Sequence, residues 1–189
     1  MNYGLSRNTL SVWARLCLSA TALFLLAGCT GIPKGVEPVR GLEAERYLGT
    51  WYSIARLDHS FERRLTDVTA HYELREDGAI SVLNRGYHPD REVWREARGV
   101  ARFIESPTVG RLKVSFFGPF HGAYNIIALD KDDYQYAMVT GPTRSYLWIL
   151  ARSPELDPDV VRRLVAQARE LDYDVDGLIY VTHEQGDRP

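Results

Sequence analysis

Eight short apolar segments, each ended by turn-forming residues, occupy residues 50–152 and constrain the fold more than any other feature. Turn signals such as Asp77-Gly78, Gly118-Pro119 and Gly141-Pro142 separate the segments. The expected strands cover residues 51–57, 68–74, 79–86, 93–103, 111–117, 123–129, 134–140 and 145–152. Short strands at even spacing predict an all-β antiparallel meander, either closed into a barrel or folded as a sandwich.

A single helix is expected after the eighth strand. Asp157 suits the N-cap position and Pro158 the first helical position. Five apolar residues recur on one helical face: Val161, Leu164, Val165, Ala168 and Leu171. The pattern predicts an amphipathic helix packed on the outside of the sheet, followed by a short extended segment at residues 178–181.

Alternation within the fourth and fifth strands indicates which side chains face the interior of a barrel. The charged residues Arg98, Arg102 and Lys113 must face water, so the residues between them face inward. These inward residues are small in the fourth strand and apolar in the fifth: Ala97, Gly99, Ala101, Leu112, Val114 and Phe116. We therefore expect a roomy apolar interior, of the size that holds one small ligand.

Such an interior favours single alkyl chains. Each buried methylene gains about 0.8 kcal/mol, so sixteen carbons gain roughly 12 kcal/mol before ordering and association costs are subtracted. A fatty acid such as palmitate, or a lysophospholipid, is expected to bind with micromolar affinity or better.

The N-terminus carries a separate signal. Arg7 and Arg15 precede a nearly continuous apolar run over residues 16–27. As a helix the run spans roughly 18 Å, which is too short for a bilayer core of about 30 Å. Because the run ends in Leu26-Ala27-Gly28-Cys29, it indicates a lipoprotein signal peptide over residues 1–28, with Cys29 as the acylated first residue. The alternatives are a transmembrane helix, or a secreted protein with a cysteine there by chance.

The residues after Cys29 indicate the compartment. Thr30 stands where aspartate would mark inner-membrane retention, so we expect an outer-membrane protein facing the periplasm. Residues 29–40 carry glycine and proline without periodicity and are expected to be a lipidated, flexible tether. Residues 41–189 then form one domain.

Composition excludes several classes of function. Cleavage of the signal peptide removes Arg7 and Arg15, so the formal net charge of the remaining chain is −4. We therefore expect no nucleic-acid partner. Cys17 leaves too and Cys29 is acylated, so no thiol remains for a disulfide or a thiolate metal site.

Neither a catalytic nor a metal-binding motif stands out. The five histidines are scattered, and the loop containing Asp130, Asp132 and Asp133 lacks the glycine and glutamate of a calcium hand. There is no nucleophile elbow and no phosphate-binding loop. We therefore expect no enzyme activity, no metal and no cofactor.

Several motifs of the chain resemble those of the lipocalin family. Gly49-Thr50-Trp51-Tyr52 resembles the family's Gly-x-Trp signature before the first strand. The segment ending in Arg152 resembles the late motif whose arginine packs on that tryptophan, and the single helix after strand eight also fits. The family's middle motif is usually Thr-Asp-Tyr, whereas here Asp132-Asp133-Tyr134 lacks the threonine, which should weaken only local hydrogen bonding.

The resemblance implies an eight-stranded antiparallel up-and-down β-barrel, with one C-terminal α-helix packed outside. It assigns structural roles to Gly49, Trp51 and Arg152, which join the first strand, the last strand and the helix at one end of the barrel. It places the loop 58–66 over the open mouth, with Phe61 near the ligand and with Arg63 and Arg64 near a head group or in water. Two further pocket candidates on the strands are Asn84 and Tyr124.

The implied function is binding, storage or transport of fatty acids or lysophospholipids for outer-membrane maintenance. A homodimer is a further implication of the resemblance. Two alternatives stay open: an enzyme acting on an amphiphile in the barrel, and a carrier of a pigment, tetrapyrrole or sterol.

Cys29→Ser should move the protein from the membrane fraction to the soluble fraction, because the anchoring acyl chains are then missing. Cell fractionation and immunoblotting measure this. The matched control is Cys17→Ser, which changes a cysteine of the cleaved signal and should leave the protein in the membrane pellet. Retention of the Cys29→Ser protein in the pellet would refute acylation of Cys29 as the anchor.

Overall fold

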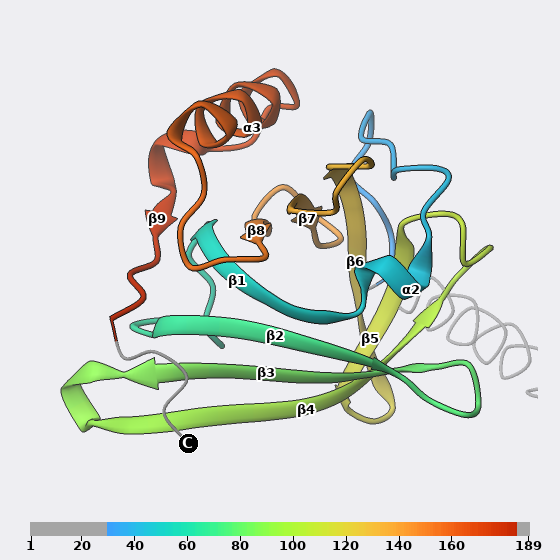
Figure 1. The fold of residues 1–189 in the computed structure, drawn as a ribbon, viewed down its shortest axis with the longest axis horizontal. Coiled ribbons are helices and arrows are strands. Elements are labelled where there is room, and N and C mark those ends of the chain that lie inside the picture. The colour runs from blue at the N-terminus through green and yellow to red at the C-terminus, as the bar shows by residue number, and fades with distance from the viewer. Residues whose placement is uncertain (1–29, 185–189) are drawn as a thin grey trace, which may run out of the picture.

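The sheet closes on itself as a barrel. The computed structural model describes residues 30–184, so the predicted signal peptide and Cys29 lie outside the described residues. The strand order is β2-β3-β4-β5-β6-β7-β8-β1-β9, every neighbouring pair is antiparallel, and β1 also pairs with β2, which closes the ring (Figure 1). The predicted eight-stranded antiparallel barrel is confirmed.

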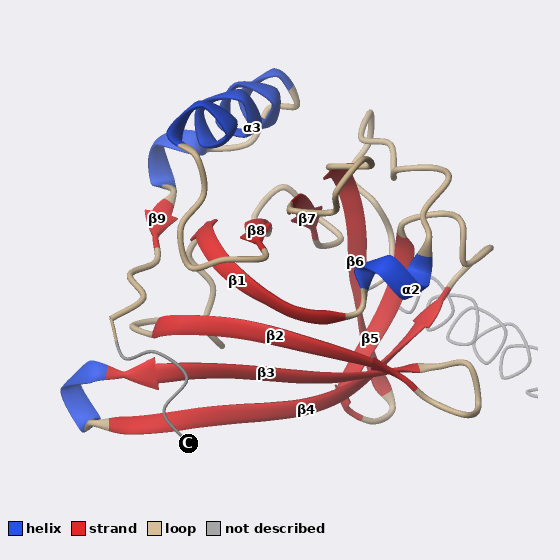
Figure 2. Ribbon diagram, in the orientation of Figure 1, coloured by secondary structure: helices blue, strands red, loops and turns tan. Residues whose placement is uncertain are grey.

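The eight barrel strands follow one another along the chain. They are β1 (Gly49–Arg56), β2 (Thr66–Leu74), β3 (Ile80–His88), β4 (Val93–Phe103), β5 (Arg111–Phe117), β6 (Phe120–Leu129), β7 (Tyr136–Thr140) and β8 (Leu147–Ala151). A two-residue strand, β9 (Ile179–Tyr180), pairs with β1 beyond β8. In Figure 2 the long strands β2, β3 and β4 form one wall, and α3 lies on the opposite side of the molecule.

The boundaries of six strands differ from the prediction by one to three residues, and the differences at β7 and β6 have clear local reasons. β7 begins at Tyr136 rather than at residue 134, because Tyr134 has a positive φ of 57° and belongs to the preceding turn. Asp130 stabilises that turn, since its carboxylate accepts a hydrogen bond from the Gln135 N–H at 3.1 Å. β6 begins three residues early, at Phe120, because Phe117 and Phe120 pair across a tight hairpin.

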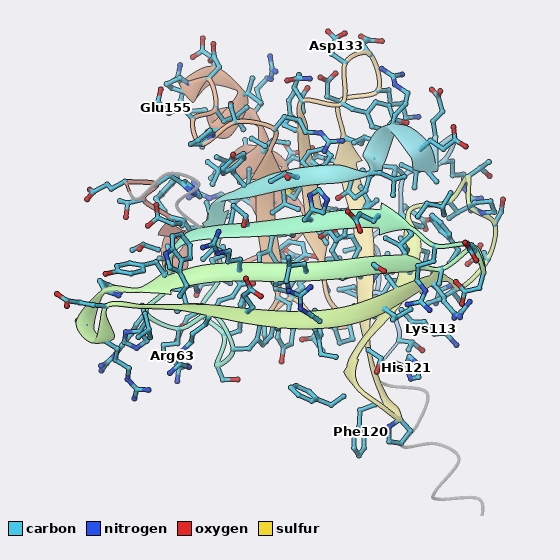
Figure 3. The ribbon with its side chains drawn as sticks, turned by 60° about the horizontal axis from the view of Figure 1, so that its bottom comes forward. Arg63, Lys113, Phe120, His121, Asp133 and Glu155 are labelled. Atoms are coloured by element: carbon cyan, nitrogen blue, oxygen red, sulfur yellow. The ribbon has the colours of Figure 1, made fainter. Side chains whose placement is uncertain are left out.

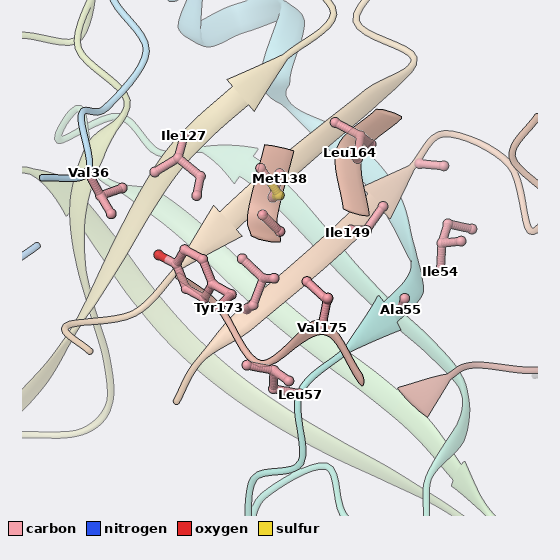
Figure 4. Close-up of a cluster of buried hydrophobic side chains, with 13 residues drawn as sticks. Val36, Ile54, Ala55, Leu57, Ile127, Met138, Ile149, Leu164, Tyr173 and Val175 are labelled. Carbon is pink, nitrogen blue, oxygen red and sulfur yellow. The ribbon is translucent and has the colours of Figure 1, made fainter. Parts of the chain in front are cut away.

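The predicted outer helix is α3 (Pro158–Glu170). The Asp157 carboxylate caps it by accepting the Asp159 N–H at 2.7 Å. Leu164 and Ala168 are the buried positions of its inner face. They pack on outward-facing side chains of β7 and β8, among them Met138 and Ile149, which Figure 4 shows in one cluster. The helix thus covers the outside of the barrel as expected. Two further short turns, η1 (Pro89–Arg91) and η2 (Val175–Gly177), are 3-10 helices.

A second apolar cluster lies inside the barrel near one end, and Trp51 is its centre. Trp51 has no exposed surface, and its indole N–H donates to the Tyr47 carbonyl at 2.8 Å. Tyr47 belongs to α2 (Ala44–Tyr47), a short helix that the sequence did not predict. The Arg152 guanidinium lies 3.9 Å from the centre of the Trp51 ring, a contact that contributes roughly 0.5–2 kcal/mol.

Arg152 also ties the surrounding chain segments together. Its three guanidinium nitrogens donate to the carbonyls of Thr50, Arg46 and Tyr134 at 3.0, 2.6 and 3.2 Å. Gly49 has a φ of 88°, and a β-carbon there would lie 3.5 Å from Arg152 Nη1. The end of the barrel formed by α2, Trp51 and Arg152 is therefore closed, and we call it the closed end.

The flexible tether expected over residues 29–40 is a wrong prediction where the structure describes it. Gly31 accepts a hydrogen bond from the Asn125 amide at 3.1 Å, and Lys34 accepts one from Arg144 at 2.8 Å. Val36 is buried in the cluster that α3 forms with the outside of β7 and β8. The Val39 N–H donates to the Ile126 carbonyl at 2.8 Å. Apolar side chains spaced along this segment hold it against the barrel, a pattern that neither helix nor strand periodicity reveals.

Trp51→Ala should lower the free energy of unfolding by about 3–5 kcal/mol, because it empties the centre of the closed end and removes the surface under Arg152. Chemical denaturation of the purified domain measures the loss. Trp94→Ala is the matched control, since Trp94 is partly exposed and packs on Tyr87 and Arg85; it should cost much less. Equal losses in the two variants would contradict the role given to Trp51.

Candidate functional site: a cavity inside the barrel

One large cavity of about 720 Å³ lies inside the barrel and opens at the end opposite Trp51. Its volume falls in the range of small-molecule sites. Side chains of β1 to β6 and β8 line it, and most of them are apolar, among them Val68, Ala70, Ile80, Val82, Ala97, Ala101, Leu112, Val114, Phe116 and Leu150. The cavity can therefore hold an apolar molecule with one end near water.

Most of the predicted pocket residues do line this cavity. They are Phe61, Asn84, Ala97, Leu112, Val114, Phe116 and Tyr124. The alternation argument succeeds here because charged neighbours fix which face of β4 and β5 is wet.

Three predicted pocket residues lie elsewhere. Arg63 is exposed and pairs with Asp58 at 2.8 Å, and Arg64 is exposed beside Asp90 at 3.5 Å, so neither lines the cavity. Gly99 faces inward, but a β-carbon there would come within 2.8 Å of the Phe116 ring. Phe116 thus fills the space that the glycine leaves. The sequence shows that a small residue stands at position 99, but it does not show which neighbouring side chain fills the space beside it.

Three tyrosines form the inner end of the cavity. The Tyr72 hydroxyl donates to the Tyr124 hydroxyl at 3.0 Å, and the Tyr47 and Tyr124 hydroxyls are 2.8 Å apart. Burial raises the pKa of all three phenols, so they stay protonated. Three hydroxyl hydrogens share two hydrogen bonds, which leaves one donor for a water or for an acceptor atom of a ligand.

A buried charged cluster lies at the mouth of the cavity, beneath the loop between β1 and β2. Arg56 is only 1% exposed and donates to the Glu62 carbonyl at 2.7 Å and to the Leu57 carbonyl at 3.3 Å. The Glu62 carboxylate lies 3.5 Å from Arg56 Nε and accepts the Trp148 indole N–H at 3.3 Å. His59 stacks on Phe61 with ring centres 4.0 Å apart. This cluster fixes the loop over the mouth.

The electrostatics of the cluster are set by burial. Burial raises the pKa of the Glu62 carboxyl to about 7, although Arg56 and the Trp148 N–H pull it down. Burial lowers the pKa of His59 to about 4, and the Arg56 charge adds to that shift. At neutral pH His59 is therefore uncharged, while Glu62 exists in both protonation states.

Glu62, Arg56 and Trp148 are residues of the mouth that were not predicted from the sequence. One signal was present: Arg56 is a lone charge in the apolar run Ile54-Ala55-Arg56-Leu57. A buried arginine of this kind needs nearby acceptors, but their identity depends on how the loop folds back.

Residues 30–184 contain no group of three or more histidine, cysteine, aspartate or glutamate side chains placed to hold a metal ion. Ser53 lines the cavity, and its hydroxyl oxygen has no hydrogen-bond partner in this part of the chain. No helix over the same residues is long and apolar enough to cross a bilayer.

A closed antiparallel barrel with a single-ended apolar cavity is the architecture of proteins that hold small hydrophobic ligands. The family profile for the lipocalin-like domain matches residues 42–183, and the chain belongs to the lipocalin family.

Close relatives agree with this assignment. The chain is 51% identical over 168 residues to the outer membrane lipoprotein Blc of Escherichia coli, covering 88% of this chain and 94% of that protein. It is 49% identical over 160 residues to the outer membrane lipoprotein Blc of Vibrio cholerae, covering 85% and 94%. Insecticyanin from Manduca sexta has the same fold, with a TM-score of 0.64, 19% identity, and coverage of 82% and 88%. The bacterial relatives place the protein at the outer membrane as a lipid-anchored protein.

The stability of the protein should depend on the protonation of Glu62. A carboxyl with a folded-state pKa of about 7 and an ordinary value of 4.5 binds its proton more tightly when folded. Between pH 7 and pH 4.5 the wild type should therefore gain stability relative to Glu62→Gln as the pH falls, by up to about 3 kcal/mol. Above the folded-state pKa the difference should level off.

Urea unfolding of both proteins at several pH values measures this difference. The depressed pKa of His59 makes both proteins less stable as the pH falls from 6.5 toward 4, and this contribution cancels in the comparison. A difference that does not change with pH would contradict the raised pKa of Glu62.

Proposed function

We propose that the protein binds one single-chain lipid, a fatty acid or a lysophospholipid, and stores or transports it for outer-membrane maintenance. The observation that carries the proposal is the cavity of about 720 Å³, closed at one end and lined mainly by apolar side chains. Membership of a family of binding proteins supports a hydrophobic ligand in general.

The energetics favour an alkyl chain in this cavity. About 0.8 kcal/mol per buried methylene gives a sixteen-carbon chain roughly 12 kcal/mol, from which the costs of ordering and association are subtracted. The cavity wall supplies few polar groups that would need partners. Micromolar or tighter binding follows.

The polar end of the ligand lies at the mouth in this proposal. Arg95 lines the opening, is exposed, and makes no ion pair with any residue in 30–184. It replaces Arg63 and Arg64 as the cation offered to a carboxylate or phosphate, since their charges already meet Asp58 and Asp90. Acylation at Cys29, an orientation toward the periplasm and a homodimer remain parts of the proposal.

Ligand identification by native mass spectrometry tests the proposal directly. The acylated protein, extracted in mild detergent, should carry one fatty acid or lysophospholipid per cavity and bind added palmitic acid or lysophosphatidylcholine stoichiometrically without product. A coloured or sterol ligand, or turnover of the lysophospholipid, would replace the proposal with one of the two alternatives.

Ala97→Trp should weaken lipid binding at least roughly tenfold, because the indole occupies the cavity that the ligand needs. Ala97 faces the cavity from the middle of β4 and lies outside both buried clusters, so the fold should tolerate the change. The matched control is Ala166→Trp on the exposed face of α3, which should bind as the wild type does. Titration with palmitic acid, read by displacement of a fluorescent fatty acid, measures both; equal affinities would exclude the cavity as the site.

A further inference from the structure

Two phenylalanines project into water from the tip of the β5–β6 hairpin. Phe117 is 79% exposed and Phe120 is 77% exposed, and only Gly118 and Pro119 separate them. Figure 3 shows Phe120 extending away from the sheet, at the opposite end of the molecule from Asp133. The two rings stand at the opening of the cavity, near Phe61 on the facing loop.

This exposure is energetically unfavourable in water. Moving a phenylalanine side chain from water to an apolar environment gains about 1.5–3 kcal/mol. Adjacent exposed aromatic residues at one edge mark an interaction surface rather than scattered surface residues. The question is which partner covers them.

The path of the N-terminal segment points to a membrane. The described chain begins at Thr30, and Gly31 is already held by Asn125 on β6. Two residues span at most about 8 Å, so an acyl chain on Cys29 is attached within that distance of Gly31. Asn125 is five residues from Phe120 on the same strand, which is roughly 17 Å.

The segment after Gly31 is packed on the barrel, so it does not act as a flexible tether between the domain and the anchor. Pro33 and Val36 are buried, and Val39 is hydrogen-bonded to Ile126. The domain therefore stays close to the leaflet that holds the anchor, and the hairpin tip lies within reach of that leaflet.

Two exposed basic side chains at the same end of the barrel are suited to contact phospholipid head groups. Arg91 and Arg95 are exposed on and beside the turn between β3 and β4 and make no ion pair with any residue in the described range. Basic side chains beside an inserted aromatic tip interact with lipid phosphates.

We propose that Phe117 and Phe120 insert into the phospholipid leaflet that carries the anchor, so that the mouth of the cavity faces the membrane. The lipid then passes between leaflet and cavity without crossing bulk water. The insertion rests on the proposed acylation of Cys29, and this route of uptake rests in addition on the proposed lipid binding.

Depth measurement on the full-length acylated protein tests the insertion. The protein is reconstituted into vesicles of phosphatidylethanolamine and phosphatidylglycerol. Because residues 30–189 contain no cysteine, Phe120→Cys introduces a single thiol for an environment-sensitive fluorophore. Leu74→Cys is the matched control, since Leu74 is 53% exposed at the end of β2 that lies beside the closed end. Phe117→Cys provides a second probe at the tip.

The labels at positions 117 and 120 should shift to shorter emission wavelengths and be quenched by spin-labelled lipid, whereas the label at position 74 should do neither. Equal behaviour of tip and control labels would overturn the proposal. A shift that grows with protein density, without quenching by the lipid, would overturn it in favour of a second copy of the chain as partner. The measurement needs no ligand, so its failure and a failure of lipid binding are distinguishable.

Discussion

The guanidinium of Arg152 packs on the indole of Trp51 and closes one end of the barrel. A barrel of eight strands is wide enough to hold a ligand, and it becomes a container only if one end is closed. Trp51 comes from the first strand and Arg152 from the residue after the last, so their contact joins the two ends of the barrel sequence. The guanidinium also donates hydrogen bonds to the carbonyls of Arg46, Thr50 and Tyr134, which belong to α2, to β1 and to the turn before β7.

The opposite end is governed by a different kind of interaction. Arg56, buried at the end of β1, holds the loop over the mouth through two carbonyls and lies beside the Glu62 carboxylate. The cavity is thus closed by a cation on an aromatic ring at one end and bordered by a buried, titratable ion pair at the other. The N-terminal segment adds a third constraint, because Gly31 and Val39 are hydrogen-bonded to β6 and hold this segment against the barrel.

Local sequence patterns predicted much of the fold. Turn residues divide the chain into strands, and the alternation of Arg98 and Arg102 with Ala97 and Ala101 shows which face of β4 is inside. The Asp157 cap and the apolar spacing after it locate α3. These patterns succeed because hydrogen-bonded turns, caps and burial of one face depend on residues only a few positions apart.

Sequence patterns were enough to predict the strands, the outer helix, the inward side chains of β4 and β5 and, through the family motifs, the Trp51–Arg152 contact. The folded barrel was needed to show which basic side chains are unpaired, because Asp58 and Asp90 neutralise Arg63 and Arg64. It was also needed to show that Phe116 fills the space at Gly99 and that residues 31–40 pack on the barrel. These outcomes depend on distances between segments far apart in the chain, and such distances are fixed only when the barrel closes.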